Sequence, residues 1–369
     1  MHRKVGCLEK RLEEVHRIKS YSAGEYFYPA SAVNAEARRL IKLDANENFF
    51  IKQHFLLQIF KELEENLDLR LYPQSEKIDL INALSQYIGL PSESFTIGNG
   101  SDELIETVVR TFLRGPERSI SISPTFSMYR IIVEAHGSAY DTVPLGKSFS
   151  LDADALLSKV TANTALCILC SPNNPTGNQF EYGSVRRILR EFKGIVVVDE
   201  AYVEFAPSSI KDAVEEFDNL IVLRTFSKAF GLAGLRIGYA IACPEVTAAL
   251  RQIQLPYNIS KVSMLMASKV LEKRKIFLDA VEEVKAERER LTRTLDEVPG
   301  IKAFNSDANF VLIKTEKDAE AILNELRTEG ILVRNIGGIP NLGRLLRVTV
   351  GLPEMNDCLI NALEAICDG

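Results

Sequence analysis

The stretch LIVLRTFSKAFGLAGLRIGYAIA, residues 220–242, joins two short apolar runs through a loop that contains glycines and polar side chains. The composition of the two runs, 220–223 and 237–242, predicts buried strands. Similar runs occur upstream, at residues 95–97, 119–122, 165–170 and 194–198. Segments with helical periodicity, such as residues 102–113, separate these runs. This alternation predicts an α/β fold with a mostly parallel sheet covered by helices on both faces.

The loop inside this stretch places an amine among groups that bind phosphate. Lys228 follows the hydroxyl residues Thr225 and Ser227, and Arg236 comes eight positions later in the chain. An amine can bond covalently to an aldehyde, while hydroxyls and a guanidinium hold a phosphate group. The loop therefore suggests a cofactor that carries both groups. Because most lysines are solvated, this interpretation depends on what else the chain supplies.

The length of the chain, 369 residues, predicts more than one domain. After about residue 250 the pattern changes to charged helical segments between 260 and 295, followed by a βαββα-like tail. We expect an N-terminal segment, a large cofactor-binding domain and a smaller α+β C-terminal domain with its connecting helices, at residues 1–42, 43–258 and 259–369. The N-terminal segment is expected to pack on the small domain or on a partner subunit.

Charge and hydropathy narrow the class of protein. The formal net charge of −6 and the pI of about 5.5 argue against a nucleic-acid surface. No apolar stretch approaches the roughly 18 residues of a membrane span. The first residues of the chain also lack the apolar core of a signal peptide. We therefore expect a cytoplasmic enzyme with neither a membrane nor a nucleic-acid partner.

The cysteines and histidines do not form a recognisable metal-binding pattern. The six cysteines are scattered, as expected for reduced thiols. Cys167 and Cys170 have a CxxC spacing, but they lie in an apolar run without a second pair nearby. We interpret both as buried strand residues. The four histidines form no ligand cluster, and we expect no metal site.

Polar motifs follow several predicted strands, at the sheet edge where open α/β sheets bind ligands. In Gly98-Asn-Gly-Ser-Asp102, backbone groups of Ser101 and Asp102 would meet a phosphate at the start of a helix. A plain turn with Ser101 as the N-cap is the alternative. Phe126 follows the next strand and would either stack on a flat ring or belong to the core.

Two further motifs suit an aromatic cofactor. Ser171-Pro-Asn-Asn-Pro-Thr-Gly-Asn178 is a rigid loop that presents the amide of Asn174 to a phenolic oxygen. Asp199 ends a buried strand, where an unpaired carboxylate is costly, and a protonated pyridine nitrogen would pair with it. Tyr202 would join Asn174 at the phenolic oxygen. Pyridoxal phosphate has all these groups; a structural Asp–Arg pair is the alternative for Asp199.

Together, these motifs resemble those of the fold-type-I pyridoxal-phosphate aminotransferases over almost the whole chain. Within that superfamily the chain is most similar to the histidinol-phosphate aminotransferases, on the softer matches LDANEN, GNGSDE and the Lys-Ser-Tyr-Ser segment near Tyr21. The matching strings are LDANEN (43–48), RLYPQ (70–74), GNGSDELI (98–105), SPNNPTG (171–177), VVVDEAYVEF (196–205), TFSKAFGLAGLRIGY (225–239), ANFVLI (308–313) and LLRVTVG (345–351).

The resemblance implies that Lys228 carries the cofactor and then moves the substrate's proton. It also implies that Tyr72 reaches the cofactor phosphate from a neighbouring subunit, so a homodimer is the expected active form. The other implied cofactor contacts are Asp199 at the pyridine nitrogen, Asn174 and Tyr202 at the phenolic oxygen, Phe126 on the ring, and Ser101, Asp102, Thr225, Ser227 and Arg236 at the phosphate.

On the substrate side, the resemblance implies that Arg347 binds the acidic group. A bidentate guanidinium fits a carboxylate or a phosphate, the acidic groups of glutamate and of histidinol phosphate. Tyr21, Asn46 and Arg334 are implied additions to the same pocket. The implied activity is amino transfer between histidinol phosphate and 2-oxoglutarate, as in histidine biosynthesis.

One departure from the family bears on the substrate. Phe49-Phe-Ile-Lys52 stands where family members have a Pro/Gly-rich stretch, and this segment is expected to border the substrate entrance. An aminotransferase for aromatic amino acids therefore stays an alternative, as does a pyridoxal-phosphate decarboxylase of phosphorylated amino acids. A cofactor-binding regulator without turnover is less favoured, because the chain has no basic recognition helix.

Overall fold

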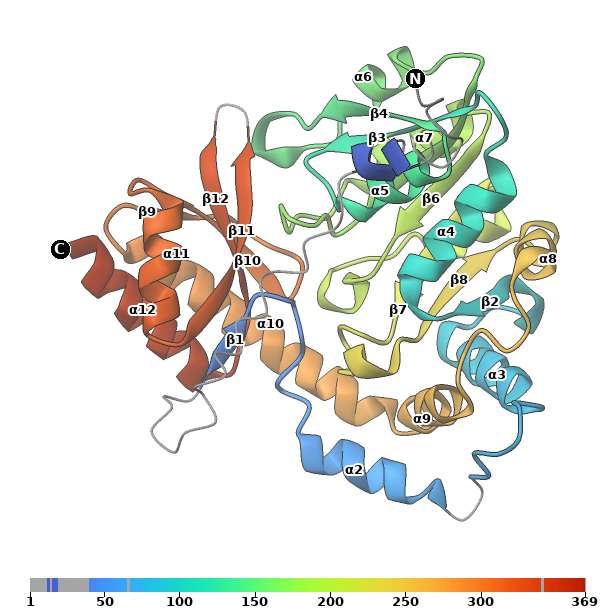
Figure 1. Cartoon of the computed structure of the whole chain (residues 1–369), viewed down its shortest axis with the longest axis horizontal. Coiled ribbons are helices and arrows are strands. Elements are labelled where there is room, and N and C mark those ends of the chain that lie inside the picture. The colour runs from blue at the N-terminus through green and yellow to red at the C-terminus, as the bar shows by residue number, and fades with distance from the viewer. Residues whose placement is uncertain (1–11, 14, 19–39, 65–66, 340–341, 369) are drawn as a thin grey trace, which may run out of the picture.

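The computed structural model describes residues 12–13, 15–18, 40–64, 67–339 and 342–368. Within these residues the chain forms a seven-stranded sheet and a five-stranded sheet, each accompanied by helices (Figure 1). The long helix α10 (Arg274–Glu297) runs between the two parts. Tyr21, one of the expected substrate contacts, lies outside the described residues, as does most of the N-terminal segment.

The larger sheet is mixed and mostly parallel, as predicted. Its order is β2 (Phe95–Gly98), β8 (Gly238–Ala242), β7 (Leu220–Thr225), β6 (Ile195–Asp199), β5 (Thr164–Cys170), β3 (Arg118–Ser123) and β4 (Ala139–Pro144). The strands from β7 to β4 are parallel, and β8 is antiparallel to both of its neighbours. The sequence did not predict β4, because this edge strand, AYDTVP, lacks a continuous apolar run.

Helices cover both faces of this sheet. One face packs on α4 (Gly100–Phe112), α5 (Met128–Ala135) and α8 (Pro244–Ile253). The other face packs on α3 (Glu76–Ile88), α6 (Ala153–Ser158), α7 (Tyr182–Glu191) and α9 (Lys261–Glu272). Alternate residues of one strand divide between the two cores, with Val196 and Val198 in one and Val197 in the other. Cys167 and Cys170 are buried in β5, as predicted.

The smaller sheet combines the C-terminal tail with a strand from the other end of the chain. Its order is β1 (Ile41–Leu43), β11 (Ile331–Ile339), β12 (Gly343–Thr349), β10 (Phe310–Thr315) and β9 (Ile301–Ala303). Only β1 and β11 pair in parallel. The sequence did not predict β1 and β9, which are too short to show a pattern. Because β1 joins this sheet, the chain near residue 43 contributes to both parts.

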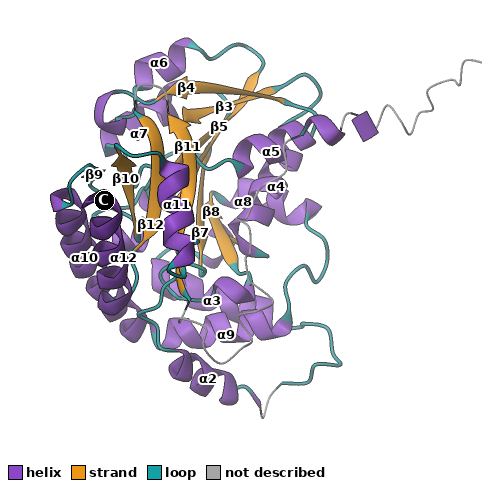
Figure 2. Ribbon diagram, turned by 60° about the vertical axis from the view of Figure 1, so that its left-hand side comes forward, coloured by secondary structure: helices purple, strands orange, loops and turns teal. Residues whose placement is uncertain are grey.

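The remaining helices pack around these two sheets. Helices α11 (Ala319–Thr328) and α12 (Pro353–Asp368) pack together, and α10 packs beside α12 (Figure 2). The charged stretch expected to be helical forms α9 and α10, which meet at Lys273. Helix α2 (Gln53–Lys61) follows β1 and packs on α9. Among the described residues, no helix combines the length and hydropathy needed to span a membrane.

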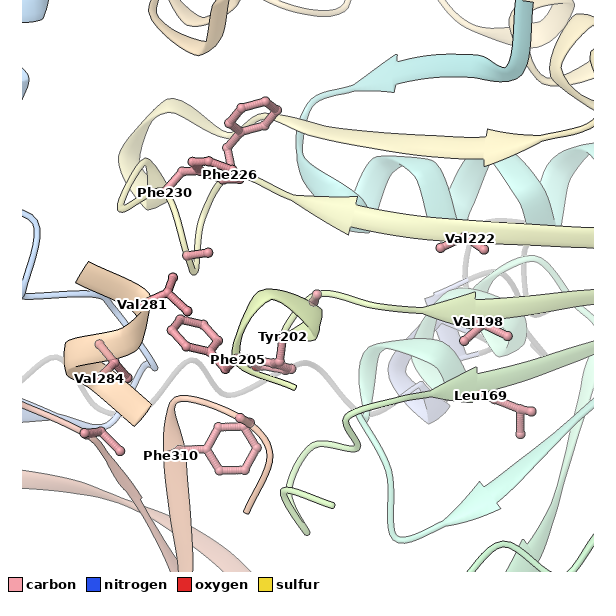
Figure 3. Close-up of a cluster of buried hydrophobic side chains, with 14 of the residues drawn as sticks. Leu169, Val198, Tyr202, Phe205, Val222, Phe226, Phe230, Val281, Val284 and Phe310 are labelled. Atoms are coloured by element: carbon pink, nitrogen blue, oxygen red, sulfur yellow. The ribbon is translucent and has the colours of Figure 1, made fainter. Parts of the chain in front are cut away.

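A cluster of buried side chains joins the two parts (Figure 3). Tyr202 and Phe205 come from the segment after β6, Val281 and Val284 from α10, and Phe310 from β10. The rings of Tyr202 and Phe310 meet edge to face, with their centroids 5.1 Å apart. The smaller sheet therefore packs directly on a loop at the carboxyl end of the larger sheet.

Candidate active site

Lys228 lies in the loop after β7, close to the chain that leaves β1. Its Nζ donates a hydrogen bond to the backbone oxygen of Ala45 over 2.9 Å, and it lies 5.8 Å from the centre of the Tyr202 ring. Burial, followed by the positive charge of Arg347, lowers the pKa of this amine to about 7. An amine with this pKa is mostly uncharged just above neutral pH, so it can act as a nucleophile or a base.

Asp199 is buried at the carboxyl end of β6, as expected, and its partners are hydrogen-bond donors. Tyr129 O–H donates to Oδ2 over 2.7 Å, and the N–H of Ala201 donates to Oδ1 over 3.1 Å. Burial raises the pKa of Asp199 to about 6, although these two hydrogen bonds act in the opposite direction. The alternative of a structural Asp–Arg pair is wrong, since Tyr129 takes the place of the arginine.

The two hydroxyls before Lys228 and the arginine after it converge, as expected. Thr225 Oγ1 lies 3.0 Å from Ser227 Oγ and accepts the N–H of Ser227 over 3.1 Å. Arg236 donates from Nη1 to Ser227 Oγ over 3.4 Å. Its Nη2 donates to Asp102 Oδ2 over 3.1 Å, which joins the loop after β7 to the first turn of α4. Hydroxyl, guanidinium and backbone N–H groups thus gather at one helix start, which is a setting for an anion.

Two glycines allow this close approach. A Cβ on Gly100 would lie 2.7 Å from Nη2 of Arg236, and Gly100 itself has a φ of +81°. A Cβ on Gly238 would lie 2.7 Å from the backbone nitrogen of Ser101. Helix α4 starts at Gly100, with Asn99 as its N-cap, so the alternative of Ser101 as the cap is wrong. Ser101 and Asp102 lie in the first turn, where N–H groups have no partner within the helix.

Asn174 and Arg347 are brought together from opposite parts of the molecule. Arg347, in β12, donates from Nη1 to Oδ1 of Asn174 over 2.7 Å and from Nη2 to the backbone oxygen of Asp44 over 2.7 Å. Both side chains are buried. The amide expected at the cofactor and the guanidinium expected at the substrate are therefore in direct contact.

Tyr202 and Asn46 are also in contact. Asn46 Nδ2 donates to the hydroxyl oxygen of Tyr202 over 3.1 Å. Burial raises the pKa of Tyr202, while Arg347 and the bond from Asn46 partly oppose this. Asn46 is only 1% exposed, and its side-chain oxygen accepts a bond from Thr349 over 3.3 Å. The side chain expected to contact substrate is thus bonded to two protein side chains.

The remaining expected residues occupy different settings. Phe126 is half-buried, and its ring meets that of Tyr129 edge to face at 5.5 Å. Arg334 lies directly opposite Arg347 in the β11–β12 ladder. Tyr72 is 70% exposed, and its ring stacks on that of Tyr257 with the centroids 4.4 Å apart.

The segment Phe49–Lys52 lines a cavity of about 1390 Å³ whose other walls include α11 and α12. The residues around this cavity do not include Lys228, Asn174 or Arg347. Phe49, Ile51 and Lys52 of the family departure therefore face a cavity that Lys228 does not line.

Sequence reasoning missed several residues that shape the site. Tyr129 and the carbonyl of Ala45 are two of them, and the buried ion pair of Arg224 with Glu200 is a third. In that pair Arg224 donates from Nε and Nη2 to Glu200 Oε2, over 3.0 and 2.8 Å. Glu200 directly follows Asp199, so it marks the same strand end from the opposite face. An acid next to the site aspartate was a visible signal for this pairing.

Comparison with known proteins places this geometry in a family. Residues 38–363 match the family model for aminotransferase class I and II. The chain belongs to this aminotransferase family. It is therefore an enzyme of the transferase class, and its α/β architecture is the fold-type-I one.

Curated relatives of this aminotransferase align over most of both chains. A histidinol-phosphate aminotransferase of Gloeobacter violaceus is 41% identical over 333 residues, covering 88% of this chain and 91% of the relative. One from Parabacteroides distasonis is 38% identical over 326 residues, covering 87% and 90%. A solved histidinol-phosphate aminotransferase of Sinorhizobium meliloti, in complex with pyridoxal-5'-phosphate, has a TM-score of 0.81 and 26% identity, covering 95% of this chain and 99% of its own.

The residues of this aminotransferase fit the cofactor of the solved relative. Asp199 is a buried carboxylate whose present partners are both neutral donors, which suits a protonated ring nitrogen. Gly100 and Gly238 let Arg236 and strand β8 lie close against the start of α4, where a phosphate would meet free N–H groups. Lys228 supplies an amine of lowered pKa beside both features. The chemistry of each donor thus matches one group of pyridoxal phosphate.

Proposed function

We propose that this aminotransferase binds pyridoxal 5'-phosphate and transfers an amino group between L-histidinol phosphate and 2-oxoglutarate, a reaction of histidine biosynthesis. The observation that carries the proposal is the grouping of Lys228, Asp199 and Arg347 around Tyr202, with Asn174 hydrogen-bonded to Arg347. The names of the curated relatives, at 38–41% identity over most of both chains, support the choice of substrate.

When bound, pyridoxal phosphate supplies an aldehyde for covalent attachment and a ring that withdraws electrons from the substrate. Asp199 would hold a proton at the ring nitrogen, because a buried carboxylate favours a cationic partner. Asn174 and Tyr202 would bind the phenolic oxygen, and Phe126 would cover the ring. Thr225, Ser227, Arg236 and the first turn of α4, at Ser101 and Asp102, would hold the phosphate.

Lys228 performs the proton transfer in this proposal. Its lowered pKa leaves the amine uncharged near neutral pH, so Nζ can accept a proton from the substrate carbon and return it elsewhere. Arg347 would bind the acidic group of the substrate, with Arg334 opposite it in the ladder. The positive charge of Arg347 also helps to lower the pKa of Lys228, so the two roles are linked.

A homodimer in the cytoplasm is part of the same proposal. Tyr72 and its stacking partner Tyr257 are 70% and 60% exposed, and the neighbouring Leu71 and Leu255 are exposed as well. Exposed apolar groups that gather in this way mark interaction surfaces. A second copy seated here would cover them and bring Tyr72 to the phosphate of the other subunit. The division into domains at residues 43–258 and 259–369 is likewise proposed, with β1 added to the second.

Side-by-side kinetics test the substrate. The value of kcat/KM for histidinol phosphate is expected to exceed that for phenylalanine, because a phosphate presents more negative charge to Arg347 than a carboxylate does. A preference for phenylalanine above about tenfold would assign the enzyme to aromatic amino acids instead. Release of carbon dioxide from a phosphorylated amino acid, without amino transfer, would assign it to the decarboxylases.

A further inference from the structure

Asn46 uses every one of its polar groups in buried hydrogen bonds. Its backbone N–H donates to Thr349 Oγ1 over 2.9 Å, and its backbone oxygen accepts from Asn309 Nδ2 over 3.0 Å. In the side chain, Oδ1 accepts from Thr349 over 3.3 Å and Nδ2 donates to Tyr202 over 3.1 Å. All four residues are less than 5% exposed. Water therefore cannot replace these bonds when one of them is lost.

The backbone at this position restricts which residue can stand there. Asn46 has a φ of +57°, in the left-handed region that glycine and asparagine adopt most readily. Glycine would accept the backbone but would lack both amide contacts. Asparagine is thus the residue that combines this turn with a donor for Tyr202.

The partners of Asn46 come from both parts of the molecule. Thr349 ends β12, two residues after Arg347, and Asn309 directly precedes Phe310, whose ring packs on Tyr202. Tyr202 belongs to the larger part, in the segment after β6. Asn46 therefore links the strand that carries Arg347 to the hydroxyl of Tyr202.

We propose that Asn46 is a positioning residue that acts through Tyr202, orienting its hydroxyl for the bound cofactor and coupling it to the β12 strand. Since Asn46 donates to the Tyr202 oxygen, the proton of that hydroxyl stays available for another acceptor. This proposal rests on the proposed function, in which Tyr202 binds the phenolic oxygen of pyridoxal phosphate. Asn46 is not a substrate contact in this account.

Besides Asn46, several groups lie near Tyr202 and influence its hydroxyl. Arg347 reaches it from β12, Asp199 from the end of β6 and Cys170 from β5. Lys228 lies 5.8 Å from its ring. Asn46, by contrast, is a neutral donor that is hydrogen-bonded to the Tyr202 hydroxyl. A change at Asn46 therefore alters the hydroxyl without changing the formal charge of the site.

The test is a double-mutant cycle read from the absorbance of the bound cofactor. Pure protein is loaded with pyridoxal phosphate, and the pH midpoint of the absorbance change is recorded for wild type, Asn46→Gly, Tyr202→Phe and the double variant. Losing the Asn46 donor makes the Tyr202 hydroxyl a weaker donor, so the midpoint should rise by about half to one pH unit. In the Tyr202→Phe background, Asn46→Gly should add less than about 0.3 pH unit.

Two results would overturn the proposal: an unshifted midpoint in Asn46→Gly, or a full shift that persists without the Tyr202 hydroxyl. If Asn46→Gly does not fold, Asn46→Ala serves in its place, because it lacks the donor and leaves the formal charge of the site unchanged. A matched pair of variants at Thr349, the hydrogen-bond partner of Asn46, completes the test. Thr349→Val should raise the midpoint, while Thr349→Ser, which keeps the hydroxyl, should retain the wild-type value.

The readout separates this proposal from the proposed function. The midpoint depends on cofactor binding and not on substrate, so it is measurable even if histidinol phosphate is not turned over. A wild-type protein that fails to bind the cofactor would refute the proposed function itself. If the wild type binds the cofactor normally but the two substitutions shift the midpoint additively, only the role of Asn46 would be refuted.

Discussion

Arg347 and Asn174 are joined by a hydrogen bond of 2.7 Å from Nη1 to Oδ1, across the boundary between the two sheets. Because Oδ1 accepts from the arginine, the amide of Asn174 is held in one orientation, with the donor Nδ2 on its other side. The arginine that is proposed to bind the substrate therefore also orients the amide proposed to bind the cofactor.

Replacing Arg347 by lysine tests the value of its planar group. Lysine keeps the charge but cannot bond bidentately to a carboxylate or phosphate while holding Asn174 and the carbonyl of Asp44. The kcat/KM for glutamate is expected to fall by about ten- to a hundredfold. Arg344→Lys, in the same strand but exposed and paired with Asp318, is the matched control and should leave kcat/KM unchanged. Equal effects at both positions would contradict the role of Arg347.

The pH dependence of cofactor attachment follows from the pKa of Lys228. Only the uncharged amine attacks an aldehyde, and burial together with Arg347 holds this pKa at about 7 instead of 10.5. The attachment rate, followed by absorbance after mixing cofactor-free protein with pyridoxal phosphate, should rise through about pH 7 and then level off. In Arg347→Ala the midpoint should move upward, because a repelling positive charge is gone. A rate that keeps rising towards pH 10 in the wild type would contradict this prediction.

Asp199→Asn should change stability with pH in a defined direction. The folded-state pKa of Asp199 is about 6, above the ordinary 3.8, so the folded protein holds this proton more tightly than the unfolded chain. That contribution to stability is present below about pH 4 and is lost as the pH rises through about 6. Relative to wild type, the free energy of unfolding of the cofactor-free variant should rise by up to about 3 kcal/mol between about pH 4 and pH 8.

Urea unfolding at several pH values measures this difference. With the cofactor bound, Asp199→Asn should instead have a lower free energy of unfolding than wild type, because asparagine cannot supply a counter-charge to the ring nitrogen. Weaker retention of pyridoxal phosphate and a low kcat are therefore expected for Asp199→Asn. Near-normal kcat would show that another group pairs with the ring.

Subunit complementation tests the proposed contribution of Tyr72 across a dimer. Lys228→Ala should be inactive yet folded, and Tyr72→Ala should bind cofactor poorly. After the two variants are mixed and re-associated, half of the dimers are mixed, and each of these has one site with both native residues. Activity should return to about a quarter of the wild-type value. No recovery in mixtures shown to contain mixed dimers would place Tyr72 in its own subunit's site.

Much of the fold followed from the sequence, because buried parallel strands are continuous apolar runs. The run before Asp199 and the run before Thr225 were recognisable for this reason, and their polar ends fell at the edge where ligands bind. The edge strand β4 was missed because one of its sides is half-exposed and its pattern is mixed. The strand β1 was missed because three residues carry no periodicity.

The candidate site was predicted where a side chain has a chemical signature of its own. Lys228, Asp199 and Asn174 each stand in a motif that suits one group of the cofactor. Tyr129 was missed because its helix also reads as core, and the carbonyl of Ala45 was missed because a backbone oxygen has no sequence signature. The bond between Asn46 and Thr349 spans 303 positions, so only the folded chain reveals it.

The central claim is that Lys228 is the residue that bonds to pyridoxal phosphate, and borohydride reduction tests it most directly. Protein loaded with the cofactor is reduced, digested and examined by mass spectrometry. A pyridoxyl group is expected on the peptide that contains Lys228, and it should be absent from that peptide in Lys228→Ala. An unmodified Lys228 peptide, or an adduct on a different lysine, would contradict it.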